Sequence, residues 1–290
     1  MRDALTRMRT RRQQSLEILD VGCGNGIALT RFLADGGNRV LGIDTHEPSI
    51  DHARRCVDVP GVEFRLAAIE SLLPEERRFD AVVFADVLEH VHEPERMLAA
   101  GVQLLRPGGR VLVTVPNGFG PFEIESSLSR LPALGPASIW TIDRFVAVLN
   151  RFVFKGAWTE VVQPADLPYN LECGHVRFFS QRGVLAIAKH AGLTLLRKTG
   201  VSWLSGPYTN YLFAPSRSFC ALNTRLADIL PFWMLSAWFF ELAPIGRTEP
   251  TPPRETSHHP APDEPTGSRR DSEGPDVRGR PRNRPCEKRE

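Results

Sequence analysis

Apolar runs typical of strands alternate with amphipathic stretches between residues 16 and 115. The runs that predict strands are 16–21, 40–43, 62–66, 79–84 and 110–115. Apolar residues recur at helical spacing between them, as in 27–33, 48–57 and 94–105. The run 79–84 is almost entirely apolar, as expected for a strand buried on both faces of a sheet. Strands that alternate with helices predict βαβ units and a parallel sheet, and therefore an α/β fold.

This regularity is lost after Pro116. Residues 117–172 combine Gly, Pro and many aromatic side chains, and we expect a helical cap inserted over the carboxyl edge of the sheet. The alternation resumes at Ser180, with strands expected over 193–199 and 237–242. The folded domain is therefore expected to span residues 16–244.

The two ends of the chain differ from its body. Residues 1–15 form an arginine-rich arm, which predicts either a solvated helix leading into the domain or a segment that binds an anionic surface. Residues 246–290 hold only three apolar side chains but nine of the 24 prolines. We therefore predict a disordered polar tail over 245–290.

The charge of the whole chain is close to neutral, with 36 Lys and Arg against 34 Asp and Glu. This balance argues against a protein whose whole surface binds nucleic acid, and we therefore expect no nucleic-acid partner. No run approaches the roughly 18 apolar residues of a membrane span, and the N-terminus lacks the apolar core of a secretory leader. We expect a cytoplasmic protein, with peripheral membrane contact through 232–240 left open.

A glycine-rich turn follows the first strand. Gly22, Gly24 and Gly26 form a G-x-G-x-G pattern, and such turns let the backbone approach a ligand closely. Asp44 ends the second strand, where a carboxylate can bind both ribose hydroxyls of an adenosine. Asp20 precedes the turn and can orient an ammonium group of a ligand. This combination predicts a nucleoside cofactor.

The glycine pattern differs from that of dinucleotide-binding proteins. The NAD fingerprint is G-x-G-x-x-G/A, and its third position is here Ile27. The turn also does not show the space at a helix N-terminus that a pyrophosphate needs. An NAD-dependent oxidoreductase stays the alternative from the same fold.

Four motifs together resemble class I S-adenosylmethionine-dependent methyltransferases. Residues 18–26 (Ile-Leu-Asp-Val-Gly-Cys-Gly-Asn-Gly) are similar to the first motif of that family, and Gly42-Ile43-Asp44 is similar to the second. The stretches 79–83 and 104–110 resemble the later motifs, in the same order and spacing. The likeness extends to ubiquinone-biosynthesis O-methyltransferases and the methyltransferase type 11/23 group.

This resemblance implies a Rossmann-like, doubly wound sheet of seven strands, the last of them antiparallel, and S-adenosylmethionine as the cofactor. The methionine end would lie at the glycine turn, the ribose at the acid after the second strand and the adenine beyond the third strand. The residues expected to bind the cofactor are Asp20, Gly22, Cys23, Gly24, Gly26, Asp44, Ala68, Ile69, Ala85 and Asp86.

A second polar cluster follows the fourth strand. In a helical turn, Asp86 would share a face with Glu89 and His90. The segment is similar to the E-x-x-E-H element of ubiquinone-biosynthesis and small-RNA 2′-O-methyltransferases, in which these residues and a later His bind a divalent metal. His175 is the candidate for the later His. The resemblance therefore makes Asp86, Glu89, His90 and His175 candidate ligands for a cation such as Mg²⁺.

Other roles for the cluster stay open. His90 and His175 are candidate catalytic residues, as a general base or as groups that orient the acceptor. The acids and imidazoles can also serve only to order the loop.

The expected reaction is methyl transfer by in-line displacement, in which the protein mainly positions the nucleophile and excludes water. After the fourth strand, the N-P-P-Y-type tetrapeptide that places nucleobase amines is replaced by residues 85–88. We therefore expect an oxygen of a small-molecule, lipid-linked or glycan-linked acceptor. Aromatic residues of the cap would form its pocket: Trp140, Phe145, Phe152, Phe154 and Trp158. A non-catalytic module that binds S-adenosylmethionine is the alternative from another functional class.

Overall fold

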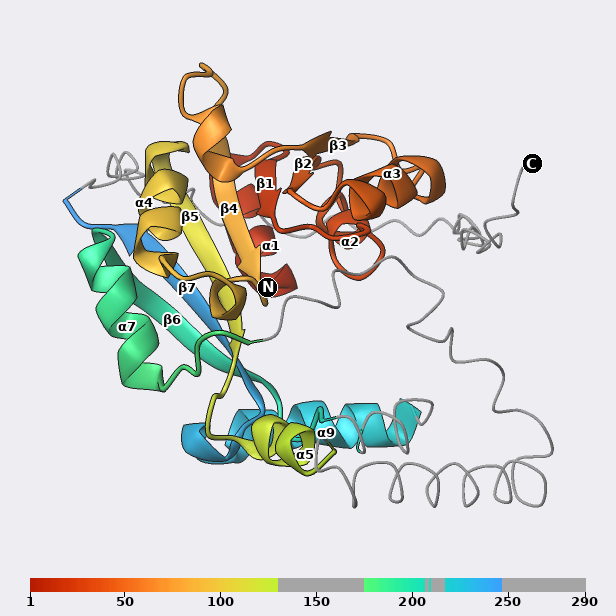
Figure 1. Ribbon diagram of the computed structural model, residues 1–290. Coiled ribbons are helices and arrows are strands. Elements are labelled where there is room, and N and C mark those ends of the chain that lie inside the picture. Colours follow the sequence, from red (N-terminus) through yellow and green to blue (C-terminus); the bar gives the residue numbers. More distant parts are fainter. Residues whose placement is uncertain (130–174, 207–208, 210–216, 247–290) are drawn as a thin grey trace, which may run out of the picture. The chain divides into compact units, whose positions relative to one another are not determined.

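The computed structural model describes residues 1–129, 175–206, 209 and 217–246. The aromatic residues 140–158 of the expected cap and the tail from 247 lie outside the described residues. Within the described part, seven strands form one sheet in the order β3-β2-β1-β4-β5-β7-β6 (Figure 1). The strands are β1 (Glu17–Val21), β2 (Arg39–Asp44), β3 (Val62–Leu66), β4 (Phe79–Ala85), β5 (Leu105–Pro116), β6 (Leu193–Ser202) and β7 (Ala237–Pro244).

Strands β1 to β5 pair in parallel, whereas β7 runs antiparallel to both β5 and β6. This order and direction confirm the predicted doubly wound fold with an antiparallel last strand. The helices are α1 (Arg2–Arg12), α2 (Thr30–Leu33), α3 (Glu47–Cys56), α4 (Pro94–Gln103), α5 (Pro121–Ser129), α7 (Gln181–His190) and α9 (Arg217–Ile229). The 3-10 turns are η1 (Ile69–Leu72), η2 (Leu88–His90) and η4 (Phe232–Met234). None of these helices has the length and apolar character needed to cross a bilayer.

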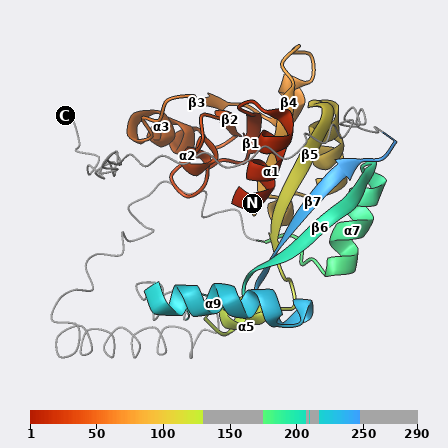
Figure 2. The ribbon, with the colours of Figure 1, turned by 180° about the vertical axis from the view of Figure 1, so that it is seen from behind.

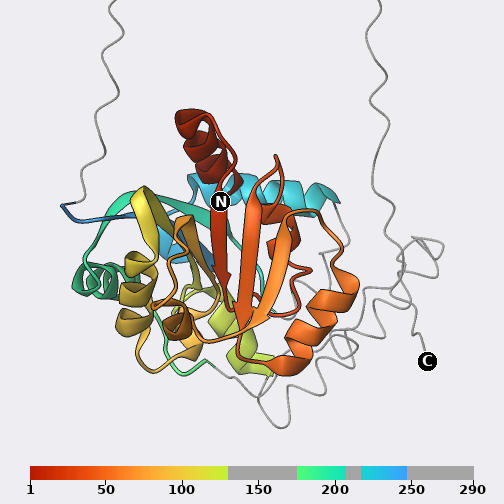
Figure 3. The same cartoon turned by 90° about the horizontal axis from the view of Figure 1, so that it is seen from above.

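Helices cover both faces of the sheet, so its central strands are buried on two sides. On one face, Val82 of β4 belongs to a cluster with Leu98 of α4 and Val184 of α7. On the other face, the next residue, Val83, belongs to a cluster with Leu5 of α1. Figures 1 and 2 show the two faces in turn, and Figure 3 shows α1 and α4 on opposite sides of the sheet. The apolar run 79–84 is therefore explained by burial on both faces.

The helix after the glycine turn is shorter than the apolar spacing predicts. Helix α2 begins only at Thr30, although the helical pattern starts at Ile27. Two features keep the chain in turns before it: Gly26 has a φ of +70°, and the Asn25 side chain accepts a hydrogen bond from the Ile27 backbone N–H at 3.2 Å. The chain between Gly22 and Leu29 therefore forms turns, and not a helix, where it passes the edge of the sheet.

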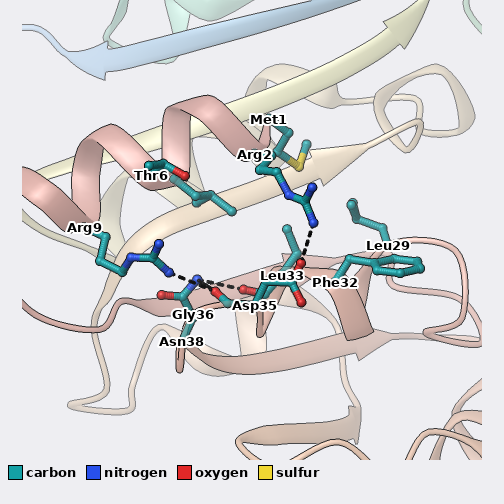
Figure 4. A pocket seen from close by; sticks show the side chains of 11 residues that line it. Met1, Arg2, Thr6, Arg9, Leu29, Phe32, Leu33, Asp35, Gly36 and Asn38 are labelled. Atoms are coloured by element: carbon teal, nitrogen blue, oxygen red, sulfur yellow. Dashed lines mark hydrogen bonds and ion pairs between the residues drawn. The ribbon is translucent and has the colours of Figure 1, made fainter. Parts of the chain in front are cut away.

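The arginine-rich helix α1 packs on the sheet through buried apolar side chains and through ion pairs of its arginines. Arg7 pairs with the buried Glu241 of β7 at 2.7 Å. In Figure 4, Arg2 of α1 reaches the carboxylate of Asp35 at 2.8 Å, and Arg9 donates to the Asp35 carbonyl at 3.2 Å. A cavity of about 590 Å³ is lined by Arg2, Arg9 and Asp35, among other residues. These arginines thus have partners within the chain.

Asp80 joins α1 to the centre of the sheet. Its carboxylate is fully buried and pairs with Arg12 at 2.9 Å and with Arg106 at 3.0 Å. It also accepts a hydrogen bond from the Glu17 backbone N–H at 2.8 Å. Oδ2 accepts the hydrogen bonds from Arg106 and Glu17, while Oδ1 has only the Arg12 ion pair among the described residues. These partners offset part of the desolvation of the buried carboxylate.

We expect Asp80→Asn to lower the free energy of unfolding by about 2–3 kcal/mol, because an amide of the same shape leaves both arginines without a buried counter-charge. Urea unfolding monitored by circular dichroism measures the change. Glu63→Gln is the matched control, since Glu63 pairs with Arg77 but is half exposed, and its effect should stay within about 0.5 kcal/mol. Equal effects of the two substitutions would contradict a central role for Asp80.

Candidate functional site

The glycine turn wraps over the carboxyl end of the neighbouring strand. The backbone N–H groups of Gly22 and Cys23 both donate to the Ile43 carbonyl, at 2.8 and 3.0 Å. The next donor, Gly24 N–H, reaches Oδ2 of Asp44 at 2.8 Å. The Asp44 carboxylate therefore fixes the turn with one oxygen. Its other oxygen accepts from the His46 N–H at 2.8 Å.

Two glycines are required by the space around them. Gly22 has a φ of +70°, and a Cβ there would lie 2.5 Å from the Val87 side chain. Gly26 has the same φ, and a Cβ there would lie 2.4 Å from the ring of Phe64 on β3. Gly26 therefore lets the turn pack on β3, and it is not among the residues that line the pocket described next.

A pocket of about 1080 Å³ opens at the carboxyl edge of the sheet. Except for Gly26, all of the expected cofactor residues line it: Asp20, Gly22, Cys23, Gly24, Asp44, Ala68, Ile69, Ala85 and Asp86. The far side of the pocket is formed by residues without a motif to reveal them, including Thr114, Thr199, Gly200, Thr224 and Asp228. His46 also lines the pocket. The volume is large enough for a nucleoside cofactor together with part of an acceptor.

Asp20 lies at the base of this pocket and is 1% exposed. Its Oδ2 accepts a hydrogen bond from the Thr30 hydroxyl at 2.7 Å. Burial raises the pKa of the Asp20 carboxyl to about 7, and the nearby charge of Asp44 acts in the same direction. A cationic group bound beside Asp20 would favour the ionised carboxylate.

A second group of side chains lies next to the pocket. Glu89, His90 and His175 have potential ligand atoms within 4.8 Å of one another. The backbone brings them together, because the Glu89 carbonyl accepts from the N–H groups of Val176 at 2.9 Å and Arg177 at 3.1 Å. The His90 and His175 rings meet edge to face at 5.0 Å between centroids. His90 also lines the pocket, so the two groups share one site.

Glu89 is placed unusually for a carboxylate. It is 1% exposed, and its Oε2 has no hydrogen-bond partner among the residues that the structure describes. Burial raises the pKa of Glu89 to about 8, and the charge of Asp86 adds to the effect. An unsatisfied buried oxygen beside two imidazoles suits a divalent cation, which accepts carboxylate and imidazole ligands.

Asp86 takes a different position from the one that a helical turn predicts. Its backbone φ is +54°, and η2 begins two residues later, at Leu88. Its Oδ1 accepts a hydrogen bond from the Thr114 hydroxyl at 3.1 Å, and it is not part of the Glu89–His90–His175 group found in the described residues. Burial raises the pKa of Asp86 as well.

Glu123 of α5 is the residue that the sequence did not reveal. Its Oε1 lies 2.8 Å from Nδ1 of His175. It belongs to the segment after β5, where neither a motif nor a periodic pattern marked a polar site.

Comparisons with known proteins show the family to which the chain belongs. Residues 1–198 match a family described as a methyltransferase domain. The chain is 35% identical over 193 residues to the ubiquinone biosynthesis O-methyltransferase of Coxiella burnetii (strain RSA 493 / Nine Mile phase I), covering 65% of this chain and 75% of that protein. It is 41% identical over 106 residues to the protein of the same name from Leptothrix cholodnii, covering 35% of this chain and 45% of that protein.

Among solved structures, an S-adenosylmethionine-dependent methyltransferase from Mesorhizobium loti aligns with 83% of this chain and 95% of its own, at 16% identity and a TM-score of 0.48. On the strength of the domain match and the Coxiella relative, the chain belongs to the S-adenosylmethionine-dependent methyltransferases. It is an enzyme of this family, and S-adenosylmethionine is its methyl donor. An NAD-dependent oxidoreductase or a non-catalytic module is not favoured.

We expect the affinity for S-adenosylhomocysteine to depend on pH through Asp20. The ionised Asp20 carboxylate attracts the ammonium group of S-adenosylhomocysteine. As the pH rises toward the Asp20 pKa of about 7, the affinity should therefore increase by up to about tenfold per pH unit, and above that pKa it should level off. Titration calorimetry between about pH 5.5 and 8 measures this profile. Asp20→Asn should flatten it, whereas the control Asp51→Asn, on the exposed side of α3, should keep it. A wild-type profile that Asp20→Asn leaves unchanged would refute this role.

Proposed function

We propose that this methyltransferase transfers the methyl group of S-adenosylmethionine to an oxygen atom of a small-molecule acceptor. The observation that carries the proposal is the position of His90, which lines the same pocket as the glycine turn and belongs to the Glu89–His90–His175 group. The relatives named ubiquinone biosynthesis O-methyltransferase support oxygen as the methylated atom. Among such acceptors, we favour the hydroxyl of an aromatic ring.

The reaction is an in-line displacement at the methyl carbon. A lone pair of the acceptor oxygen forms the new C–O bond while the C–S bond breaks. The electron pair of the broken C–S bond stays on sulfur. The sulfonium becomes a neutral thioether, and the hydroxyl proton leaves to a base. We assign this base to His90, because an imidazole side chain that lines the pocket can accept a proton from the acceptor.

A divalent cation belongs to the same proposal. Glu89 and His175 would hold it, because the one free lone pair of a neutral His90 imidazole is needed for the hydroxyl proton, and Oε2 of Glu89 would give the cation an anionic ligand. When bound, such a cation lowers the pKa of a coordinated hydroxyl. The residues of this chain then have to orient the acceptor and keep water away from the methyl group.

The charge of the pocket favours an uncharged acceptor. The charged side chains among its described lining residues are all acidic: Asp3, Asp20, Asp44, Glu70, Asp86 and Asp228. Such a lining attracts the sulfonium of the cofactor and repels phosphate or carboxylate groups. Together with apolar lining residues such as Met97 and Phe239, it fits a neutral phenol or catechol, free or lipid-linked, better than a phosphorylated glycan or a nucleic acid.

The test is methyl transfer from labelled S-adenosylmethionine to a panel of acceptors: a catechol with a short prenyl chain, the same catechol bearing a carboxylate, a neutral glycan and an adenosine. We expect a methyl ether of the neutral catechol, identified by mass spectrometry. His90→Ala should lower kcat about 10²-fold or more through loss of the base, with unchanged affinity for S-adenosylhomocysteine.

His92→Ala provides the matched control, because His92 is an exposed neighbour that is not among the pocket-lining residues. It should keep wild-type activity. Methylation of only the glycan, or only at a nitrogen of the adenosine, would reject the proposed acceptor class. Wild-type kcat in His90→Ala would reject the base.

A further inference from the structure

Glu123 reaches the Glu89–His90–His175 group from a different part of the chain. It is 7% exposed, on the first turn of α5, and its Oε1 is hydrogen-bonded to Nδ1 of His175 at 2.8 Å. The His175 side chain is also mostly buried, with 15% of its surface exposed. A buried carboxylate aimed at one imidazole nitrogen is a specific arrangement rather than a surface ion pair.

The turn that carries α5 is fixed on two sides. The Asn117 side-chain amide donates to the carbonyls of Trp233 at 2.9 Å and Leu235 at 2.8 Å, just before β7. The Gly118 N–H donates to the Phe179 carbonyl at 2.9 Å, just before α7. Both neighbours belong to the scaffold of the sheet, so α5 and its Glu123 are held against the site.

The His175 ring is also fixed by its neighbours. Phe122, next to Glu123 on α5, stacks on it with centroids 5.8 Å apart and planes 29° apart. His90 meets it edge to face at 5.0 Å. Packing therefore sets the plane of the ring, and the hydrogen bond from Nδ1 sets its rotation within that plane.

This hydrogen bond decides which nitrogen of His175 carries the proton. A carboxylate only accepts hydrogen bonds, so Nδ1 must be the donor and carry the hydrogen. In the neutral ring, Nε2 is then left with a free lone pair. A metal-binding imidazole needs this arrangement, in which a carboxylate holds one nitrogen while the other binds the cation.

We propose that Glu123 is the positioning residue of this centre: it holds His175 in the Nδ1–H tautomer and presents Nε2 to a divalent cation. The inference rests on the proposed cation site and adds to it a residue that touches the His175 ring and not the cation. It also gives the segment after β5 a part in the site, in addition to any role in acceptor binding.

The tautomer can be measured in the metal-free protein. Long-range ¹H–¹⁵N correlation spectra distinguish Nδ1–H from Nε2–H imidazoles, and His175→Gln assigns the signal. We expect Nδ1–H in the wild type and in Glu123→Gln, whose amide oxygen still accepts, but a shift toward Nε2–H in Glu123→Ala. Glu125→Gln is the control, because Glu125 lies on the same helix but accepts hydrogen bonds from Thr209. This variant should leave the spectrum unchanged. An Nε2–H signal in the wild type, or no change in Glu123→Ala, would overturn the proposal.

Titration calorimetry with Mn²⁺ at one fixed pH tests the consequence for the cation. We expect Glu123→Ala to weaken binding about 10–100-fold, and Glu123→Gln to weaken it less. Affinity for S-adenosylhomocysteine should stay at the wild-type value in both, which also shows that they fold. Wild-type Mn²⁺ affinity in Glu123→Ala would overturn the inference. No Mn²⁺ binding by the wild type would overturn the cation site itself, while methyl transfer to the neutral catechol would still stand or fall by its own assay.

Discussion

The parallel pairing of β1 with both β2 and β4 is the constraint on which the site depends. Asp20 of β1 pairs with Gly42 of β2 and with Val83 of β4, all in the buried centre of the sheet. Parallel strands end at the same edge, so the glycine turn, Asp44 and the Asp86–His90 segment meet there although long stretches of chain separate them. A shift of one residue in β1 would turn Asp20 to the other face of the sheet as well as move the turn.

Several acidic side chains lie at this edge of the sheet, and their burial costs desolvation free energy. Asp20 and Glu89 have pKa values raised to about 7 and about 8, and burial is the largest cause for both. An uncompensated buried carboxylate is unfavourable, and cationic ligands relieve it. The sulfonium and ammonium groups of the cofactor suit one end of the pocket, and a divalent cation suits Glu89 at the other. The destabilised acids thereby favour binding of the groups that the reaction needs.

The sequence was sufficient for those parts of the fold that short-range patterns encode. Apolar runs located the strands, because a strand buried on both faces must be apolar throughout, and the G-x-G-x-G turn with Asp44 located the pocket. Finer geometry depends on packing between distant parts of the chain. Position 26 must be glycine because the ring of Phe64, almost 40 residues away in the chain, leaves no room for a Cβ. Asp86 accepts a hydrogen bond from Thr114 and does not follow a helical turn. Glu123 could not be found, because its partner His175 is 52 residues distant and no spacing rule joins them.

One measurement tests the central claim most directly: a crystal structure of the protein with S-adenosylhomocysteine and Mn²⁺. We expect the ribose hydroxyls within hydrogen-bond distance of Asp44, the sulfur facing the side of the pocket where His90 lies, and Mn²⁺ bound by Glu89 and His175. A cofactor bound elsewhere, or a sulfur facing away from His90, would contradict a single site in which the strand edge holds the donor beside the group that activates the acceptor.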